Sequence, residues 1–577
     1  MGHFIRVVFF LTAFNFLACN IPGIMPPLSR LSGLLVLTAW VCMYLPFSLA
    51  RSGKCILALS AIPVSFALVL REPTFLLGIS LCLWALIILS KTKSMSRAGE
   101  LPVYLLMIVS YTLYLTLYRY SPYCWFFLQK TALTYSSAVT ALVDNEMTLG
   151  PTAAGIPITV SMLCYSLGLI YYKRKVGFAL AALCTPLLAN AAFLCLQQPL
   201  ADLVSLFDKT LKTSPLNLQA ILMLVSAATF YPLIRKMEFN GVRSGVLREE
   251  RLKAAAAVIL VFVSIFVLSF YRNGTKHNGE IIFCDKGTNW AVPNFSKKYG
   301  QKSAGMFGML PYYLEMRGYK TKVIKEPLTV QILSKASAVV VFNPSKYFTG
   351  MEKKNLFRFI ENGGALLVAG DHTDVSGVMG PVNDILTPFN ITLNFDTALP
   401  ITSGWIHGLE KRPHPVTAVL NKDQGAGIWV GASLAVSPPA RPVITGKLGW
   451  ADIGDYSNKK RAFLGNYKRS SNEQLGDVVL VAESEYGEGR VLVFGDTSTF
   501  QNGILMNTYF FIDDIFSWLV SARGSLYDPF RQTLLCLALL APAVFLLIRM
   551  PSTVMLMAFV LSAHAALWVS QSTGSMK

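Results

Sequence analysis

The residues of this chain that could do chemistry are acids, hydroxyls and a histidine that follow short apolar runs between residues 280 and 500. Three of them, Asp371, His372 and Asp496, are candidate catalytic residues, because a histidine beside carboxylates can act as a general base or bind a metal. The full set of candidate ligand-binding residues is Asp285, Trp290, Asn343, Asp371, His372, Thr373, Asp374, His414, Asp496 and Ser498. Such a set favours a sugar, another oxygen-rich ligand or a metal ion.

The same residue types have a structural alternative. An Asp followed by Thr or Ser after a strand commonly caps the next helix or closes an Asx turn. The sequence has no HExxH, CxxC or comparable spacing of ligands, so it predicts no confident metal site and implies no cofactor. It also lacks the GxxxxGK[ST] pattern, which excludes nucleotide hydrolysis through a P-loop.

Short β-branched runs alternate with amphipathic stretches around these candidates, which predicts an α/β domain with a mainly parallel sheet. The predicted strands are 281–284, 320–324, 338–342, 365–369, 478–482 and 491–494, and the predicted helices are 303–317, 350–362 and 503–520. An irregular insert near 397–475 is expected to form extra strands or a loop-rich cap. Because ligands bind outside the carboxyl ends of the strands in open α/β sheets, the candidates should converge at one edge.

Two motifs of this domain resemble a known family. The stretches VVVFNPSKYFTGMEKKNLFRFIENGGALLVAGDHTD and YGEGRVLVFGDTSTF are similar to the class I glutamine amidotransferase-like fold, and more closely to its non-amidotransferase relatives in bacterial membrane proteins. The resemblance covers roughly 280–390 and 475–520 and implies a flavodoxin-like parallel sheet. Amidotransferases carry a nucleophilic cysteine at a sharp strand-to-helix turn. The equivalent turn here has Asp371-His372-Thr373 and no thiol, so a binding domain is expected rather than glutamine hydrolysis.

The composition of the rest of the chain predicts a membrane protein. Of 577 residues, 53% are hydrophobic and 14% charged, where a soluble domain has about 25% charged residues. Runs of about 20 apolar residues can cross a bilayer. They predict about eleven transmembrane helices, at 4–22, 31–50, 55–70, 73–90, 101–118, 150–172, 177–198, 215–234, 254–271, 532–548 and 553–571. The predicted fold is therefore a polytopic α-helical membrane protein with an inserted α/β domain.

The predicted domains are an N-terminal membrane domain, 1–272, the α/β domain, 275–522, and a C-terminal pair of membrane helices, 531–572. An amphipathic segment near 122–147 is expected to lie at the membrane interface. With the N-terminus in the cytoplasm, 16 Lys and Arg of the short loops lie inside and six outside. This asymmetry predicts an inner-membrane, multi-pass protein whose residues 275–522 and C-terminus are extracytoplasmic.

The charge distribution also bears on partners. Residues 275–520 hold 25 Lys and Arg against 22 Asp and Glu, so the net charge of +19 belongs mainly to the other residues. A nucleic-acid-binding domain would itself carry a basic patch, and a nucleic-acid partner is therefore excluded. The expected partners are the lipid bilayer, other envelope or membrane proteins, and a polysaccharide or other oxygen-rich ligand.

Three functions remain open at this stage. The first is an extracytoplasmic binding or scaffold module of an envelope export or polysaccharide system. The second is a membrane-anchored hydrolase, with or without a metal, that acts on an envelope polymer through Asp371, His372 and Asp496. The third follows from a weak resemblance of the segment LVDNEMTLGPTAAGIPITVSMLCYSLGLI to the exosortase and archaeosortase transpeptidases. It implies a degenerate sortase-like enzyme, because Thr152-Ala153-Ala154-Gly155 stands where that family has its cysteine.

Overall fold

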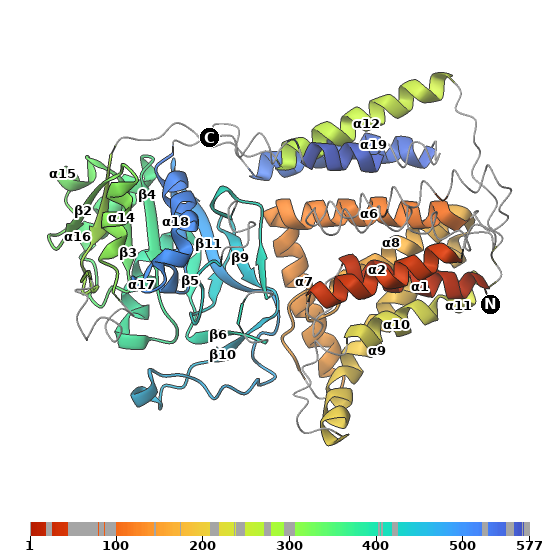
Figure 1. Cartoon of the computed structure of the whole chain (residues 1–577), viewed down its shortest axis with the longest axis horizontal. Coiled ribbons are helices and arrows are strands. Elements are labelled where there is room, and N and C mark those ends of the chain that lie inside the picture. The colour runs from red at the N-terminus through yellow and green to blue at the C-terminus, as the bar shows by residue number, and fades with distance from the viewer. Residues whose placement is uncertain are drawn as a thin grey trace. The chain divides into compact units, whose positions relative to one another are not determined.

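The computed structural model divides into two compact units (Figure 1). The helical unit comprises Met1–Glu146, Pro151–Phe270 and Pro529–Gln571, and the sheet unit comprises Met147–Gly150, Tyr271–Asp528 and Ser572–Lys577. The structure describes residues 2–18, 26–43, 79, 86, 100–143, 146–173, 175–207, 219–235, 237, 248–269, 279–292, 306–401, 404–405, 408–417, 425–521, 529–549, 559–567 and 569.

The helical unit is built from apolar helices whose lengths decide whether they can cross a membrane. Its described helices are α1 (Gly2–Ala18), α2 (Pro26–Cys42), α6 (Leu101–Tyr120), α7 (Pro122–Ala141), α8 (Ile156–Lys173), α9 (Val176–Phe207), α10 (Gln219–Thr229), α11 (Tyr231–Ile234), α12 (Arg248–Ser269) and α19 (Pro529–Arg549). Within the described residues, two segments are long and apolar enough to span a bilayer, Leu101–Tyr120 and Val176–Gln197. The prediction of about eleven transmembrane helices in a polytopic protein is therefore wrong.

The length of the apolar part of each helix explains the error. Several apolar runs that were counted as spans form apolar helical segments of 10–17 residues, such as Ile156–Tyr171 and Ala255–Ser269. At 1.5 Å per residue, a segment of about 16 residues covers about 24 Å, which is short of the ~30 Å hydrocarbon core. The predicted spans 55–70 and 73–90 lie outside the described residues, apart from positions 79 and 86. The orientation was derived from the eleven spans and stays a prediction.

Polar side chains inside the helical unit bond mainly to its own helices. Asn15 of α1 accepts a hydrogen bond of 2.7 Å from the Ser161 hydroxyl of α8. The buried turn 152–155 receives the Asn190 side chain at the carbonyl of Ala154, at 2.9 Å. Gln219 donates to the carbonyls of the same turn. The turn that resembles the sortase site is thus held by amide side chains from two other helices.

The sheet unit contains an eight-stranded sheet in the order β2-β1-β3-β4-β12-β11-β9-β7 (Figure 1). The strands are β1 (Glu280–Cys284), β2 (Lys320–Ile324), β3 (Ala336–Phe342), β4 (Ala365–Ala369), β7 (Leu409–Lys411), β9 (Arg441–Gly446), β11 (Val478–Tyr486) and β12 (Gly489–Phe494). The first five strands of the order are parallel neighbours. The remaining pairs are antiparallel, so the sheet is mixed and the prediction of a parallel sheet is wrong.

The loop between β11 and β12 explains the antiparallel half. Two residues, Gly487 and Glu488, join the strands, and Gly487 has a φ of +58°. A two-residue loop can only form a hairpin, because parallel neighbours need a crossover of about a dozen residues. The YGEG sequence is itself a hairpin signal, so the sequence alone could have predicted this antiparallel pair.

The parallel strands are buried on both faces, as their continuous apolar runs require. On one face, Phe283, Val340 and Leu367 belong to a core cluster that also contains residues of α14 (Met309–Met316) and α18 (Leu505–Leu519). α16 (Gly350–Glu361) contacts β4 and β12. It begins with a capping box between Thr349 and Glu352 and ends before Gly363, whose φ is +101°. The short helices α15 (Val330–Leu333) and α17 (Met379–Leu386) complete the set of described α-helices in this unit.

The insert between β4 and β12 adds two small antiparallel ladders to the sheet unit. β5 (Ile391–Leu393) pairs with β8 (Leu434–Val436), and β6 (Asp396–Pro400) pairs with β10 (Gly449–Ile453). The segment 147–150 also belongs to this unit. Gly150 donates its N–H to the carbonyl of Leu475 at 2.8 Å, and Leu475 donates back to Thr148 at 3.0 Å. The predicted interfacial segment, 122–147, includes only the first residue of this stretch, and its helix ends at Ala141 as α7.

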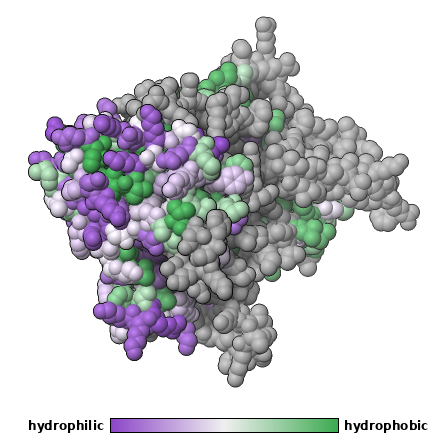
Figure 2. All heavy atoms as spheres, turned by 60° about the vertical axis from the view of Figure 1, so that its left-hand side comes forward, coloured by the Kyte–Doolittle hydropathy of each residue, from purple (hydrophilic) through white to green (hydrophobic). Residues whose placement is uncertain are grey.

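Hydrophilic residues cover most of the described surface of the sheet unit that Figure 2 brings forward, and hydrophobic residues gather there in smaller separate patches. The candidate residues Asn343, Asp371 and Asp496 follow β3, β4 and β12, at the edge of the sheet where these strands end.

Candidate functional site

Three neighbouring strand ends are held in line by backbone hydrogen bonds. Asn343, which follows β3, donates its N–H to the carbonyl of Ala369 at 2.9 Å. Gly370, which follows β4, donates to the carbonyl of Phe494 at 3.0 Å. The loops after β3, β4 and β12 therefore leave the sheet side by side, and the polar residues in them meet as the sequence predicts for parallel strands.

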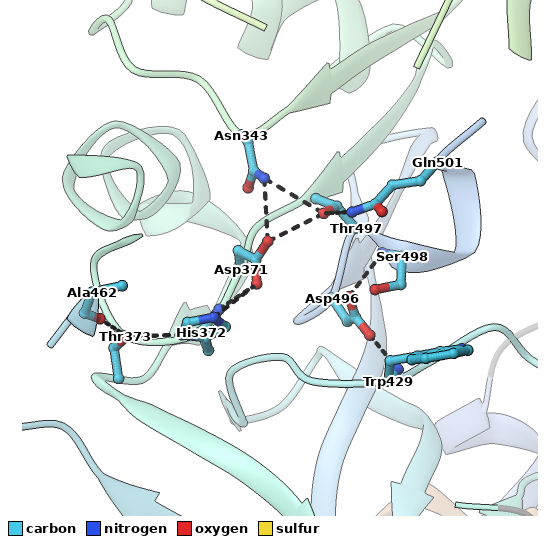
Figure 3. A network of polar contacts seen from close by, with 10 residues as sticks. All are labelled: Asn343, Asp371, His372, Thr373, Trp429, Ala462, Asp496, Thr497, Ser498 and Gln501. Carbon is cyan, nitrogen blue, oxygen red and sulfur yellow. Dashed lines mark hydrogen bonds and ion pairs between the residues drawn. The ribbon is translucent and has the colours of Figure 1, made fainter. Parts of the chain in front are cut away.

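Asp371 lies at the centre of the polar network that these loops form (Figure 3). Its Oδ1 accepts the N–H of His372 at 2.9 Å. Its Oδ2 accepts the Thr497 hydroxyl at 3.3 Å and lies 3.5 Å from Nδ2 of Asn343. Gln501 donates from Nε2 to the Thr497 hydroxyl at 3.3 Å. The side chain of Asp371 stays 20% exposed, so its carboxyl remains within reach of a ligand.

His372 is oriented by the residue that follows it. Its Nδ1 lies 2.9 Å from the hydroxyl of Thr373, which donates to the carbonyl of Ala462 at 2.5 Å. Because a hydroxyl has one proton to donate, Thr373 accepts from His372, and Nδ1 carries the proton. In the neutral ring, Nε2 then keeps a free lone pair, and it lies 3.9 Å from Oδ1 of Asp371. In this tautomer Nε2 of the imidazole is an acceptor.

The backbone of the site is strained at two positions. Asn343 has a φ of +40° and Thr373 a φ of +41°. This region is unusual for any residue with a side chain and most unfavourable for a β-branched one. Strain of this kind costs about 1–3 kcal/mol and persists where the surrounding structure fixes it. Here the fixing contacts include the N–H of Thr373, which bonds to the carbonyl of Asp396 at 3.0 Å.

Asp496, the second carboxyl group, is buried after β12. Its Oδ1 accepts the N–H of Ser498 at 2.7 Å, and its Oδ2 accepts the N–H of Trp429 from the insert. Burial, with the charge of Asp371 adding to it, raises the pKa of Asp496 to about 7 despite these bonds. Burial also raises the pKa of Asp371, although its hydrogen bonds and His372 oppose the shift. In the described part of the chain, neither carboxyl group pairs with a lysine or arginine.

Several predicted candidates lie outside this network. Asp285 closes a turn onto the N–H of Gly287 at 3.2 Å and lies 3.8 Å from Nζ of Lys325. Asp374 caps α17 by accepting the N–H of Met379 at 2.9 Å. Trp290 packs on the rings of Phe283 and Phe342, with centroid distances of 5.1 and 5.9 Å. These three residues support the fold locally.

His414 also lies elsewhere, in a buried cluster on the antiparallel half of the sheet. Its Nε2 is 3.0 Å from Oε2 of Glu483, whose other oxygen pairs with Nε of Arg441. The His414 ring packs edge-on against Trp518 at 4.9 Å. Burial lowers the pKa of His414. Although burial alone would raise the pKa of Glu483, Arg441 and His414 lower it to about 2. This cluster is charge-compensated and closed to solvent.

The network therefore contains Asn343, Asp371, His372, Thr373, Asp496 and Ser498 of the predicted candidates. It also contains Thr497, Gln501 and Trp429, which were not among the predicted candidates. Gln501 is separated from the GDTST motif by Phe500, in a stretch that often precedes the start of a helix. Trp429 is the sole aromatic residue of the glycine-bearing stretch GAGIWVGAS, and this isolation is the signal that could have identified it.

Metal and thiol chemistry have few candidate groups here. Among the described residues, no group of three or more His, Cys, Asp or Glu side chains is arranged to hold a metal ion. Cys284 is the one cysteine between residues 275 and 520, and its side chain is buried at the end of β1. Burial raises the pKa of its thiol to about 12, so it is not a thiolate nucleophile at neutral pH.

The sheet unit is thus an α/β domain with a polar site at its strand ends, and comparison with known proteins gives it one family match. Residues 310–507 match a family model described as "Domain of unknown function (DUF4350)". No curated protein matches the chain.

Solved structures similar to the chain cover less than half of it. The N-terminal domain of mmIFT52 is 18% identical, with a TM-score of 0.31, and the match covers 43% of this chain and all of that one. A ThuA-like protein from Bacteroides uniformis is 12% identical, with a TM-score of 0.25, over 44% of this chain and 94% of that one. A cytoplasmic protein from Salmonella typhimurium is also 12% identical, with a TM-score of 0.25, over 42% and 100% of the two chains.

Proposed function

We propose that the sheet unit is a non-amidotransferase relative of the class I glutamine amidotransferase-like fold, and that it binds an oxygen-rich ligand at the Asp371 network. The strand order β2-β1-β3-β4-β12 supports this relationship, because it matches the 2-1-3-4-5 order of flavodoxin-like sheets. The turn after β4, where the family has its nucleophile, holds Asp371 and His372 instead of a cysteine. Such a site binds its ligand without glutamine hydrolysis.

The observation that carries the proposal is the partial exposure of Asp371 and His372 within a fixed network. Their side chains are 20% and 17% exposed, while three strand ends hold them in place. Carboxyl oxygens, an amide and hydroxyl groups offer both donors and acceptors, which is what a ligand rich in hydroxyl groups requires. The strained backbone at Asn343 and Thr373 agrees with a built site rather than a simple helix cap.

A thermal-shift screen of the purified full-length protein tests this proposal. The compounds are sugars, sugar alcohols, L-glutamine and ATP, each at millimolar concentration, and the variants are Asp371→Asn and Asp285→Asn. Asp285 is a matched control, because it follows β1 and its side chain is 18% exposed. A hydroxyl-rich compound should stabilise the wild type and Asp285→Asn but not Asp371→Asn. Equal responses from both variants would refute the site.

A hydrolase is the second candidate function, and the orientation of His372 favours it. With the proton on Nδ1, Nε2 of the neutral ring has the lone pair that a general base needs, and the side chain is 17% exposed. The buried carboxyl of Asp496, with its pKa raised to about 7, would supply a nearby acid. Release of reducing ends from an envelope polymer, lost in both His372→Ala and Asp371→Ala, would favour the hydrolase. Binding without release would favour the binding module.

The cellular setting is also proposed. We infer that the helical unit anchors the protein in a membrane through Leu101–Tyr120 and Val176–Gln197, and that the sheet unit works outside the cytoplasm in an envelope export or polysaccharide system. Because two spans return the chain to the side on which it began, the N-terminus then lies outside as well, unlike in the orientation expected from eleven spans. The excess of basic residues outside 275–520 supports an association with anionic lipid. A reporter that is active only outside the cytoplasm, fused after Ser303, should be active. A fusion that works only in the cytoplasm would overturn this orientation.

A further inference from the structure

Trp429 is a large apolar side chain that the fold holds out in solvent beside the Asp371 network. Its side chain is 62% exposed, although its neighbours Ala426 and Ile428 are 3% and 6% exposed. A tryptophan in an ordinary loop gains free energy by turning into the core. The exposure of this ring therefore needs an explanation from the local structure.

The backbone around Trp429 is fixed on both sides. Its N–H bonds to Asp496, and its carbonyl accepts the indole N–H of Trp405 at 3.0 Å. Two residues later, Gly431 and Ala432 bond to β6 at Ala398 and to Gly495, at 2.7 and 2.8 Å. A Cβ on Gly431 would lie 2.4 Å from the carbonyl oxygen of Gly495, so the segment packs directly on the end of β12. The fixed backbone therefore holds the indole ring of Trp429 in solvent.

The position of the ring connects it to the polar site. The backbone N–H of Trp429 bonds to Asp496, and the charge of Asp371 acts on Asp496; Figure 3 draws Asp496 between Trp429 and Asp371. An indole face carries negative charge density, so it attracts the polarised C–H groups of an apolar ligand face. Beside it stand hydroxyl and carboxyl groups that bind hydroxyl groups. A ligand that fits both groups has an apolar face and hydroxyl groups at its edge, and a pyranose ring has this form.

The charge of the site selects among ligands that stack on aromatic rings. In the described part of the chain, neither Asp371 nor Asp496 pairs with a lysine or arginine. Nucleotides and other phosphate-bearing ligands would meet uncompensated carboxylates, which repel them. Neutral sugars meet no such repulsion.

We propose that Trp429 is the stacking surface for the ring of a neutral saccharide whose hydroxyl groups bind the carboxyl group of Asp371. This inference rests on the proposed ligand site and names its ligand class. Fixing the indole before binding removes the entropic cost of ordering it, so the ring adds affinity without any movement of the loop. A substitution at Trp429 should therefore weaken binding through loss of the stacked face, while Asp371 should remain able to contact the hydroxyls.

The test is a surface binding assay on the full-length protein in a detergent without a sugar head group. The probes are dextran, mannan, xylan and laminarin as neutral polysaccharides, with alginate and polyphosphate as anionic ones. The wild type should bind at least one neutral polysaccharide. Trp429→Ala should bind it at least tenfold more weakly, and Trp429→Phe should lie between the two. Tyr312→Ala is the matched control, since that ring is 60% exposed on α14, and it should bind as the wild type does.

The outcomes separate this inference from the proposed function. If Asp371→Asn loses binding while Trp429→Ala stays within twofold of the wild type, the stacking role is refuted and the ligand site survives. If Trp429→Ala loses binding while Asp371→Asn does not, the proposed site at the network fails. Binding of the anionic probes alone, or of no probe, overturns the saccharide inference. An unchanged melting temperature in Trp429→Phe shows that a loss of binding does not come from misfolding.

Discussion

Two clusters in the sheet unit contain a histidine and carboxyl groups, and their charges are balanced in opposite ways. In the buried cluster, Glu483 lies between Arg441 and His414, and these partners lower its pKa to about 2. At the strand ends, burial and, to a smaller extent, the nearby carboxyl group of Asp371 raise the pKa of Asp496 to about 7. The first arrangement compensates a buried charge, and the second leaves one uncompensated.

This difference teaches which cluster is available for function. A buried carboxylate that is paired with an arginine and hydrogen-bonded to a histidine has its hydrogen-bonding capacity used within the fold, so it contributes to stability and specificity of packing. A carboxyl pair without cations keeps capacity for an external partner, and perturbed groups of this kind concentrate at functional sites. The sequence shows His372 beside Asp371, but it could not show the second cluster, because His414 meets Glu483 and Arg441 only in space.

The largest expected effect comes from breaking the compensated cluster. Glu483→Gln leaves Arg441 without its buried carboxylate, so we expect a loss of about 3–5 kcal/mol in the free energy of unfolding. Denaturant unfolding followed by circular dichroism measures it. Glu485→Gln is the control, because Glu485 lies 4.0 Å from Nη2 of Arg441 and its side chain is 27% exposed. A similar, small effect of both variants would show that the buried cluster is not structural.

The two clusters should also respond to pH with opposite sign. Because the pKa of Asp496 is raised in the folded chain, its contribution to stability is full at acidic pH and is lost as the pH rises from about 4 toward 7. Because the pKa of Glu483 is lowered, its contribution is present above about 4.5 and is lost as the pH falls toward 2.

Unfolding of Asp496→Asn between pH 4 and 8 checks the first of these slopes. The wild type should lose a few kcal/mol relative to the variant over that range, on the scale of about 1.4 kcal/mol per unit of pKa shift. The variant also removes the carboxylate from the N–H groups of Trp429 and Ser498, but that loss does not depend on pH. Parallel stability profiles of the two proteins would contradict the raised pKa.

A smaller effect is expected at the hydrogen bond from Thr373 to Ala462, which joins the strand-end network to the insert. Thr373→Val removes the hydroxyl that donates to Ala462 and accepts from His372, which should cost about 1–2 kcal/mol. Thr321→Val is the control, because its hydroxyl bonds at 2.8 Å to Glu315 in an exposed position and should cost under about 0.5 kcal/mol. A thermal melt measures both. Equal costs would mean that Thr373 does not hold the insert to the site.

The smallest expected effect on stability is at Asp371 itself. Asp371→Asn removes a carboxyl group whose pKa burial has raised, so unfolding at pH 7.5 should change by less than about 1 kcal/mol. Asp285→Asn, outside the network, should behave similarly, which makes the two variants matched in stability and different only in ligand binding. A loss at Asp371→Asn as large as that at Glu483→Gln would erase the contrast between the clusters.

The strands of the sheet unit could be predicted from the sequence because each buried strand is a separate short apolar run. The predictions 320–324 and 365–369 coincide with β2 and β4, since β-branched runs bounded by glycine or charged residues leave little freedom in where a strand ends. The meeting of Asn343, Asp371 and Asp496 then follows from parallel strands ending at one edge.

Other features could not be read in the same way. The roles of Trp429 and Ala462 depend on how the insert folds back on the strand ends, and the insert has no period that predicts its path. The antiparallel direction of β11 follows from the two-residue loop between β11 and β12, which the prediction of a parallel sheet did not take into account. The span count failed because apolar runs measure composition, while the helix ends decide whether a segment reaches across a bilayer.

Hydrogen–deuterium exchange of the full-length protein, with and without the neutral polysaccharide that it binds most tightly, tests the central claim most directly. The claim is that the uncompensated carboxyl pair at the strand ends is the ligand site. It predicts slower exchange in 370–375, 428–432 and 495–501, and unchanged exchange around His414 and Arg441. Protection confined to the His414 cluster, or no protection in any peptide, would contradict the account.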